Sequence, residues 1–212
     1  DAMTSGDLND DGVEDLVLLS RDEEAFLVHS TDDFTPEFCK FPQGTGTLRL
    51  DVSFPNLEYP HKMAVGDVNG DGVDDLLFSR WNELGCPYDT ADPDNCVPDR
   101  VSVKTGTAAS WEDFAFDVEV AALVGKGPSD IGAGDFNADG FEDAVTANAV
   151  SEDLSFVMGQ SPFVGNVVRR FDLNAGQTNT TLAVGDLNED GVPDLVTAHR
   201  ETNLVQVILS SP

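Results

Sequence analysis

Four segments of the chain carry aspartate, asparagine and glycine at one repeated spacing. They read GDLNDDGVEDLVLLS from Gly6, GDVNGDGVDDLLFSR from Gly66, GDFNADGFEDAVTAN from Gly134 and GDLNEDGVPDLVTAH from Gly185. All four share the pattern Gly-Asp-x-Asn-x-Asp-Gly-x-x-Asp. Four copies of so specific a pattern in 212 residues indicate an internal repeat.

The repeated loop supplies the oxygen atoms that a calcium ion needs. Ca²⁺ takes six to eight oxygens at about 2.3–2.6 Å, and a tight loop can present them at alternating positions. Counting from the leading aspartate, the pattern offers side chains at positions 1, 3, 5 and 9 and a backbone carbonyl at position 7, while the glycine at position 6 permits a sharp turn. The predicted ligands are Asp7, Asn9, Asp11, Val13 and Asp15; Asp67, Asn69, Asp71, Val73 and Asp75; Asp135, Asn137, Asp139, Phe141 and Asp143; and Asp186, Asn188, Asp190, Val192 and Asp194.

The charge of these loops favours bound calcium over an ordinary turn. Three carboxylates in one short loop repel each other unless a divalent ion lies among them. Magnesium prefers a compact octahedron, and zinc prefers histidine and cysteine, which the pattern lacks. The alternative is a set of Asp/Asn/Gly turns between strands, but an ordinary turn does not need a further aspartate at position 9. We therefore expect about four structural Ca²⁺ per chain.

Two helical calcium motifs are excluded by the same loop. A standard EF-hand needs a bidentate glutamate at position 12, where this chain has Leu18, Phe78, Thr146 and Thr197. Dockerin modules begin similarly, but their closing aspartate lies at position 12 on a helix. Here the closing aspartate lies at position 9, before an apolar run that reads as a strand.

Short apolar runs around each loop predict an all-β fold of antiparallel meanders. A central strand, buried on both faces, is predicted directly after each loop. A first strand precedes the loop, a third follows the central strand, and an outer strand completes the unit. The predicted central strands cover 16–19, 76–78, 144–147 and 195–198, and the predicted outer strands cover 47–54, 111–120 and 164–173.

The loop spacing divides the chain into four units. The leading aspartates, at positions 7, 67, 135 and 186, stand 60, 68 and 51 residues apart, lengths that suit a three- or four-stranded sheet. We predict units at 1–61, 62–129, 130–180 and 181–212, with an insertion at 85–99. The last unit has a third strand at 204–209 and lacks an outer strand. Because an open strand edge invites pairing, we expect the native chain not to be a self-contained monomer.

The cysteines point to a local crosslink. Cys86 and Cys96 bracket the polar stretch PYDTADPDN inside the insertion, a spacing that suits a disulfide closing a surface loop. The alternative is two unpaired thiols in that loop. Cys39 stands alone and is most simply read as a small buried apolar residue.

The charge excludes several kinds of partner. Acidic residues number 40 against 11 basic ones, a formal net charge of −29, so nucleic acid and anionic membranes would be repelled. No apolar stretch approaches the roughly 18 residues that would span a bilayer, so membrane insertion is not expected. Hydrophobic residues make up 40% of the chain and recur in short ordered runs, which argues against a disordered acidic tail.

The loops and their flanking strands resemble the FG-GAP and VCBS-type repeats of integrin α-subunit propellers and of many secreted microbial proteins. This resemblance implies that each loop joins the first two strands of a blade, that calcium is structural and that blades circle a central axis, usually seven of them. The fold we expect is therefore a β-propeller-type array of four blades. Four units leave three arrangements open: part of a longer propeller, a closed four-bladed ring, or a subunit completed by a neighbouring chain.

The function expected from these features is non-catalytic. His29, His61 and His199 have no neighbours that suggest a catalytic base, and no nucleophile elbow or phosphate-binding loop is present. We expect a secreted, extracellular or cell-surface module for adhesion, ligand binding or assembly, with a protein or carbohydrate ligand, or neighbouring copies bound at the open edge. The alternatives are a propeller domain of a secreted polysaccharide-active hydrolase or lyase, and a subunit of an extracellular fibre or surface layer.

Overall fold

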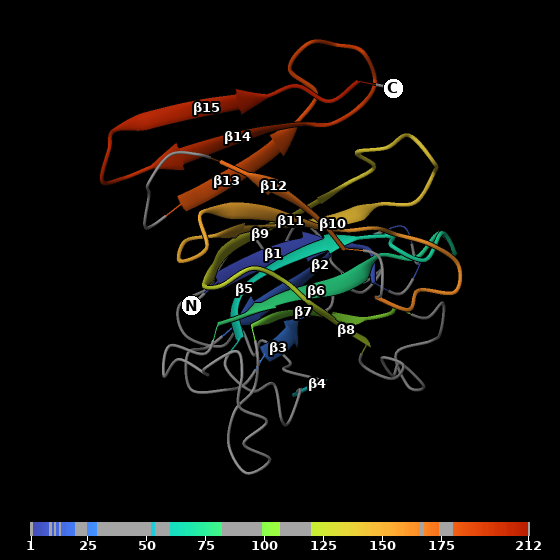
Figure 1. Cartoon of the computed structure of the whole chain (residues 1–212). Coiled ribbons are helices and arrows are strands. Elements are labelled where there is room, and N and C mark those ends of the chain that lie inside the picture. Colours follow the sequence, from blue (N-terminus) through green and yellow to red (C-terminus); the bar gives the residue numbers. More distant parts are fainter. Residues whose placement is uncertain are drawn as a thin grey trace, which may run out of the picture.

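The computed structural model describes residues 2–8, 10, 12, 14–19, 25–28, 52–53, 60–81, 99–106, 120–165, 168–173 and 180–211. These residues form four small antiparallel β-sheets, and every regular element among them is a strand (Figure 1). The expectation of an all-β chain of antiparallel meanders is confirmed. None of the described residues belongs to a helix that could cross a membrane.

Each sheet is a meander in which strands that follow one another in the chain pair with each other. Sheet 1 contains β1 (Ala2–Gly6), β2 (Asp15–Leu19), β3 (Ala25–Val28) and β4 (Val52–Ser53). Sheet 2 contains β5 (Pro60–Gly66), β6 (Asp75–Arg80), β7 (Arg100–Lys104) and β8 (Val120–Leu123). Sheet 3 contains β9 (Pro128–Gly134), β10 (Asp143–Asn148), β11 (Asp153–Val157) and β12 (Val168–Asp172). Sheet 4 contains β13 (Thr180–Gly185), β14 (Asp194–His199) and β15 (Leu204–Ile208).

The central strands β2, β6, β10 and β14 lie where the apolar runs predicted them. Each begins at the aspartate of loop position 9, because that residue pairs with the glycine before the loop: Gly6 with Asp15, Gly66 with Asp75, Gly134 with Asp143 and Gly185 with Asp194. The repeat is thus reproduced residue for residue at the start of every sheet. The loop with the repeated pattern is the turn between the first and second strand of each sheet.

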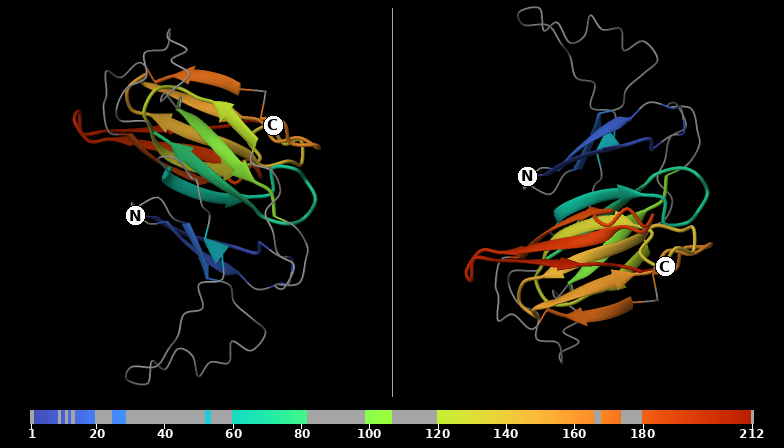
Figure 2. Two further views of the ribbon diagram at one scale, coloured as in Figure 1. Left: turned by 90° about the horizontal axis from the view of Figure 1, so that it is seen from below. Right: turned by 90° about the horizontal axis from the view of Figure 1, so that it is seen from above.

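The sheets pack face to face in chain order. Strand β1 packs on β5, β5 on β9 and β9 on β13. Figure 2 shows sheet 1 at one side of this arrangement, next to β5, and Figure 1 shows sheet 4 at the top, next to sheet 3. Three apolar clusters fill the three junctions between sheets.

Burial along the central strands follows this order. All residues of β6 and β10 are buried, because sheets 2 and 3 are covered on both faces. Strands β2 and β14 instead alternate between buried and partly exposed residues. Sheets 1 and 4 therefore each have one face that is packed and one that is more open.

The outer strands are partly described. Strand β12 lies inside the predicted range 164–173. Strand β4 is a short piece of the predicted range 47–54, and β8 starts at Val120, the last residue of the predicted range 111–120. The rest of those two ranges, and most of the insertion at 85–99, lie outside the described residues.

Candidate metal-binding loops

Loop 2, between β5 and β6, is folded around its own aspartate side chains. The backbone N–H groups of Gly70 and Asp71 donate to Asp67 Oδ1 at 2.7 and 3.2 Å, and that of Gly72 donates to Asp67 Oδ2 at 2.9 Å. The Asp71 N–H also donates to Asn69 Oδ1 at 2.8 Å, and the Val73 N–H donates to Asp71 Oδ1 at 2.9 Å. Side chains at positions 1, 3 and 5 therefore shape the loop.

Loops 3 and 4 repeat this arrangement at the same positions. In loop 3 the N–H of Asp139 donates to Asp135 and Asn137, at 3.1 and 2.9 Å. In loop 4 the N–H of Asp190 donates to Asp186 and Asn188, at 3.2 and 2.9 Å. Three loops of different sequence thus adopt one geometry, as the shared pattern predicts.

Two left-handed residues make the turn of every loop. The glycine at position 6 has φ between 82° and 90° in all four loops, a region that side chains disfavour, so the glycine is required there. Position 4 is also left-handed, and it is occupied by Asp10, Gly70, Ala138 and Glu189 with φ between 56° and 72°. The sequence predicted the turn at the position 6 glycine. Position 4 has a different residue in each loop, so the sequence did not indicate its left-handed conformation.

The aspartate at position 9 is buried in every sheet and ties the loop to the strands. Asp75 is fully buried, its Oδ2 accepts from the N–H of Val68 at 3.0 Å, and its Oδ1 accepts from the N–H of Gly106, just after β7, at 2.8 Å. In sheet 4 the matching donors to Asp194 are Leu187 and Ser210, at 2.9 and 2.8 Å. One carboxylate therefore fixes both the loop and the residue that follows the third strand.

Burial makes two of these carboxylates hard to ionise. The pKa of Asp75 is raised to about 7, mainly by burial and also by the neighbouring charges of Asp71 and Asp67, although its backbone hydrogen bonds act in the opposite direction. Burial likewise raises the pKa of Asp143 to about 6, with Asp139 and Asp135 adding to the rise. The carboxylates at positions 1, 5 and 9 are therefore close enough to repel each other.

Asp143 also carries an oxygen without a hydrogen-bond partner. Its Oδ1 accepts from the Gly159 N–H at 2.8 Å, but its buried Oδ2 has no partner in the described part of the chain. The N–H of Phe136 donates to the carbonyl of Gly134 at 3.0 Å, and it also lies near enough to Asp143 to lower the pKa of that carboxyl. A buried carboxylate oxygen without a hydrogen-bond partner could bind a cation. A bound cation would lower the free-energy cost of burying the negative charge.

The atoms predicted to be metal ligands are not gathered around a common point. Within the described residues, no three acidic, histidine or cysteine side chains converge closely enough to hold a metal ion. In loops 2, 3 and 4, side-chain oxygens of positions 1, 3 and 5 accept hydrogen bonds from backbone N–H groups of the same loop. In loop 1, Asn9, Asp11 and Val13 lie outside the described residues, while Asp7 accepts from the Gly12 N–H at 2.8 Å and Asp15 from the Leu8 N–H at 3.1 Å. The predicted disulfide of Cys86 and Cys96 also lies outside them.

Neighbouring loops are joined by the acid at position 8, a contact that the sequence analysis missed. Glu142 of loop 3 accepts from the N–H of Asp67 at 3.0 Å, and its own N–H donates to the Asp67 carbonyl at 3.0 Å. Asp74 of loop 2 makes the same pair of bonds with Asp7, at 2.9 and 3.2 Å. Loop 4 has Pro193 at position 8, and a Cβ added to Gly134 would lie 3.0 Å from the Pro193 Cγ. The signal in the sequence was an acid at position 8 of three loops, next to the predicted ligand at position 9.

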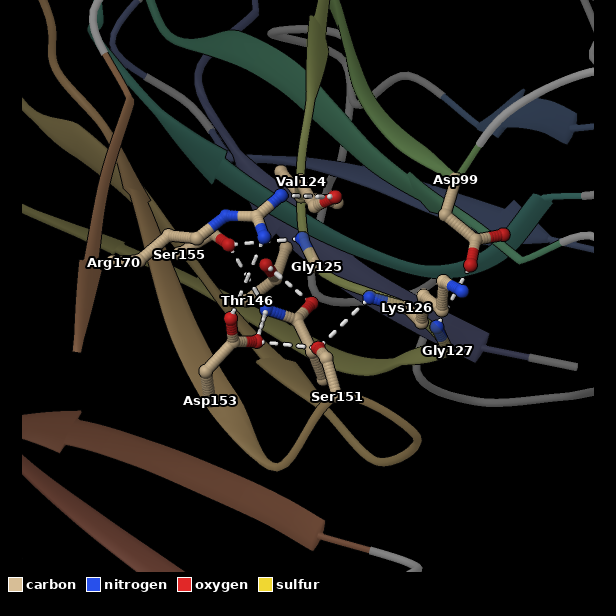
Figure 3. Close-up of polar contacts among 11 residues, drawn as sticks. Asp99, Val124, Gly125, Lys126, Gly127, Thr146, Ser151, Asp153, Ser155 and Arg170 are labelled. Atoms are coloured by element: carbon tan, nitrogen blue, oxygen red, sulfur yellow. Dashed lines mark hydrogen bonds and ion pairs between the residues drawn. The ribbon is translucent and has the colours of Figure 1, made fainter. Parts of the chain in front are cut away.

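A buried polar cluster in sheet 3 was also missed (Figure 3). The Asn148 side-chain amide donates to Asp153 at 2.8 Å and to the Ser155 hydroxyl at 2.9 Å. That hydroxyl accepts from the Gly125 N–H at 3.0 Å, and Arg170 lies 3.8 Å from Asp153. The cluster holds the segment that follows β8 against sheet 3. Its members are hydroxyl, amide, carboxylate and guanidinium groups that satisfy each other, which is the arrangement of a structural contact.

Comparison with known protein families agrees with the repeat geometry. The family of the FG-GAP-like repeat matches residues 7–78, from position 1 of loop 1 into β6. Residues 7–78 are an FG-GAP-like repeat. Among curated proteins, none matches the chain. The FG-GAP-like match covers two of the four loops, and loops 3 and 4 share their pattern and their hydrogen bonds.

Proposed function

We propose that this chain is a non-catalytic, extracellular, calcium-stabilised module built from four propeller-type blades, with a role in adhesion, ligand binding or assembly. The observation that carries the calcium part is the buried, unpartnered Oδ2 of Asp143 beside the acidic side chains of its own loop. The FG-GAP-like repeat supports the same reading, because such repeats typically bind calcium.

The residues that would hold the ions are the oxygen donors at positions 1, 3, 5, 7 and 9 of each loop. When bound, Ca²⁺ supplies the positive charge that offsets the repulsion among these carboxylates. The loop's own residues already provide the turn, through two left-handed positions, and the attachment to the third strand, through the aspartate at position 9. Oxygen donors alone favour calcium over zinc.

The loops also connect calcium to the packing of the sheets. The backbone of position 1 bonds to the acid at position 8 of the next loop at the first two junctions. A change in the shape of one loop would therefore move the contact between two sheets. In this view the ions stabilise the loop contacts that join neighbouring sheets.

The calcium role is tested by thermal unfolding with and without chelator. A ligand that binds only the folded chain adds about 2.7 kcal/mol per independent site at 100 times its Kd. We expect a large rise of the unfolding temperature in calcium, a small one in magnesium at the same ionic strength, and reversal by chelator. An unfolding temperature that chelator leaves unchanged would contradict the proposal.

The extracellular and non-catalytic parts rest on the resemblance and on the residues present. Extracellular calcium modules bind with Kd of about 10⁻⁴–10⁻³ M, a range that loops of exposed carboxylates suit. The buried polar groups of sheet 3 are engaged with each other in hydrogen bonds, which is the arrangement of a structural contact. A hydrolase assay on soluble polysaccharides that gave turnover by the chain alone would overturn the non-catalytic assignment.

A further inference from the structure

Sheet 4 exposes an apolar face whose counterparts in sheet 2 are buried. Val205 and Val207 of β15 are 62% and 56% exposed. Val205 pairs with Ala198, and Val207 pairs with Val196. The equivalent pairs in sheet 2 are Val101 with Ser79 and Val103 with Leu77. Val101 and Val103 are 0% and 1% exposed, because sheet 3 covers them. The sheet 4 face, defined here as Leu187, Val196, Ala198, Val205 and Val207, is thus the type of surface that another sheet covers elsewhere in this chain.

Gly185, at the end of β13, also differs from its counterparts in the other three sheets. A Cβ on Gly6 or Gly66 would collide with the next sheet, at Val65 and Ala133 respectively, and a Cβ on Gly134 would make a tight contact with Pro193 at 3.0 Å. A Cβ on Gly185 would meet nothing within 4 Å. Leu187, two residues later, is 54% exposed, whereas Leu8 and Val68 at the same loop position are fully buried. The space beside sheet 4 therefore has the shape of an unfilled junction.

Sheet 1 exposes the complementary face. In sheet 2, Met63 pairs with Phe78 and Val65 with Leu76, and these four residues pack against sheet 1. In sheet 1 the same register pairs Met3 with Leu18 and Ser5 with Leu16. Met3 is 69% exposed, and Leu16 and Leu18 are partly exposed. We define the sheet 1 face as Met3, Ser5, Glu14, Leu16 and Leu18.

A polar contact completes the match between the two faces. Glu14 lies at position 8 of loop 1, the position from which Asp74 and Glu142 accept the backbone N–H at position 1 of the preceding loop. Glu14 is exposed and accepts from the Ser5 hydroxyl of its own sheet at 2.8 Å. The matching donor on sheet 4 is the N–H of Asp186. The two faces thus carry the apolar and the polar halves of a junction that occurs twice inside the chain.

We propose that the sheet 4 face binds the sheet 1 face of a second copy of this chain, head to tail, with the second copy's Glu14 accepting from the Asp186 N–H. The inference extends the assembly role within the proposed function, but it rests on sheet packing and not on calcium. A contact between two different faces can repeat from copy to copy, so it gives rings or open filaments.

Two variants that each block one face test the proposal. Val207→Asp places a charge on the sheet 4 face, and Met3→Asp places one on the sheet 1 face; both replace exposed residues, so the fold should survive. Leu123→Asp, at a 61% exposed position of β8, is the matched control. Gly185→Val is a second block of the sheet 4 face, since it fills space that is empty in the single chain.

The assay is sedimentation over a range of concentrations in calcium, with enough salt to screen the charge of −29. We expect the wild-type chain and Leu123→Asp to form assemblies that grow with concentration. Val207→Asp, Gly185→Val and Met3→Asp alone should each remain monomeric, with association weakened at least about tenfold. A mixture of Val207→Asp with Met3→Asp should form a dimer and nothing larger. Val207→Asp keeps its sheet 1 face and Met3→Asp keeps its sheet 4 face, so only one contact can form between them.

Three results would overturn the inference. A wild-type chain that stays monomeric at the highest concentration would show that these two faces do not bind each other. Dimers formed by Val207→Asp or by Met3→Asp alone would show that the interface joins identical faces. Equal loss of association in Leu123→Asp would show nonspecific apolar contact. A chelator arm separates the two proposals: if assembly occurs but chelator changes neither stability nor assembly, the calcium role fails and the head-to-tail contact stands.

Discussion

Replacing Asp143 with asparagine should change stability in opposite directions with and without calcium. Asp143 is fully buried, its Oδ2 has no hydrogen-bond partner, and its pKa is raised from 3.8 to about 6. Without calcium, a folded-state pKa about two units above the unfolded value destabilises the fold by up to about 3 kcal/mol near neutral pH, taking about 1.36 kcal/mol per unit. The asparagine removes that charge and keeps the oxygen that accepts from Gly159.

The amide also introduces a cost, because its NH₂ group takes the place of Oδ2 and needs acceptors. One buried unsatisfied group costs about 1–3 kcal/mol, so we expect a net gain of about 1 kcal/mol in chelator. For a chain of this size that is a rise in unfolding temperature of about 2–4 °C. In calcium the variant loses one ligand, and with it up to about 2.7 kcal/mol at 100 times the Kd of that site.

The assay is thermal unfolding followed by circular dichroism, in calcium and in chelator at the same pH. Asp153→Asn is the matched control, because Asp153 is a buried aspartate of the same sheet that lies outside the loops and binds Asn148 and Ser151. It should lower the unfolding temperature similarly in both conditions. If Asp143→Asn does the same, Asp143 is a structural hydrogen-bond acceptor and the reasoning is refuted.

Three further outcomes follow from the same contacts. In chelator, the free energy of unfolding should fall as pH rises from about 4 to about 7, because Asp75 and Asp143 bind protons in the folded chain that they release when unfolded. Denaturant titrations at several pH values should show this fall in chelator and should not show it in calcium. A free energy of unfolding that does not change with pH in chelator would contradict the prediction. Gly66→Ala should destabilise the chain by about 1–3 kcal/mol because its Cβ meets Ala133 and Glu142, whereas Gly185→Ala should be within about 0.5 kcal/mol of wild type; equal effects would remove the distinction between packed and open sheets. Glu142→Ala should cost about 1–3 kcal/mol by leaving the Asp67 N–H without its acceptor, while Glu14→Ala in dilute solution should cost little, and a reversed order would disprove the role of position 8.

The sequence was sufficient to predict the central strands and the loop, because both depend on local patterns. The aspartate at position 9 starts β2, β6, β10 and β14, and the glycine at position 6 takes the left-handed conformation that the turn needs. These features lie within about ten residues of each other, where spacing and residue type decide the conformation. The loop between the first two strands of each sheet was predicted for the same reason.

The contacts between sheets could not be predicted in the same way. Glu142 meets the Asp67 backbone across 75 residues, and Arg170 reaches the Val124 carbonyl across 46. Nothing local distinguishes the acid at position 8 from any exposed acid in a chain with 40 of them. The difference between buried β6 and half-open β14 likewise depends on which sheet has a neighbour, not on the strands themselves.

Equilibrium calcium binding tests the central claim most directly. The chain is dialysed exhaustively against chelator, returned to chelator-free buffer and titrated with calcium by calorimetry, with bound metal measured independently by elemental analysis. The four oxygen-donor loops predict about four calcium ions per chain, no comparable binding of zinc, and loss of one ion in Asp143→Asn. One ion or none per folded chain would contradict the account.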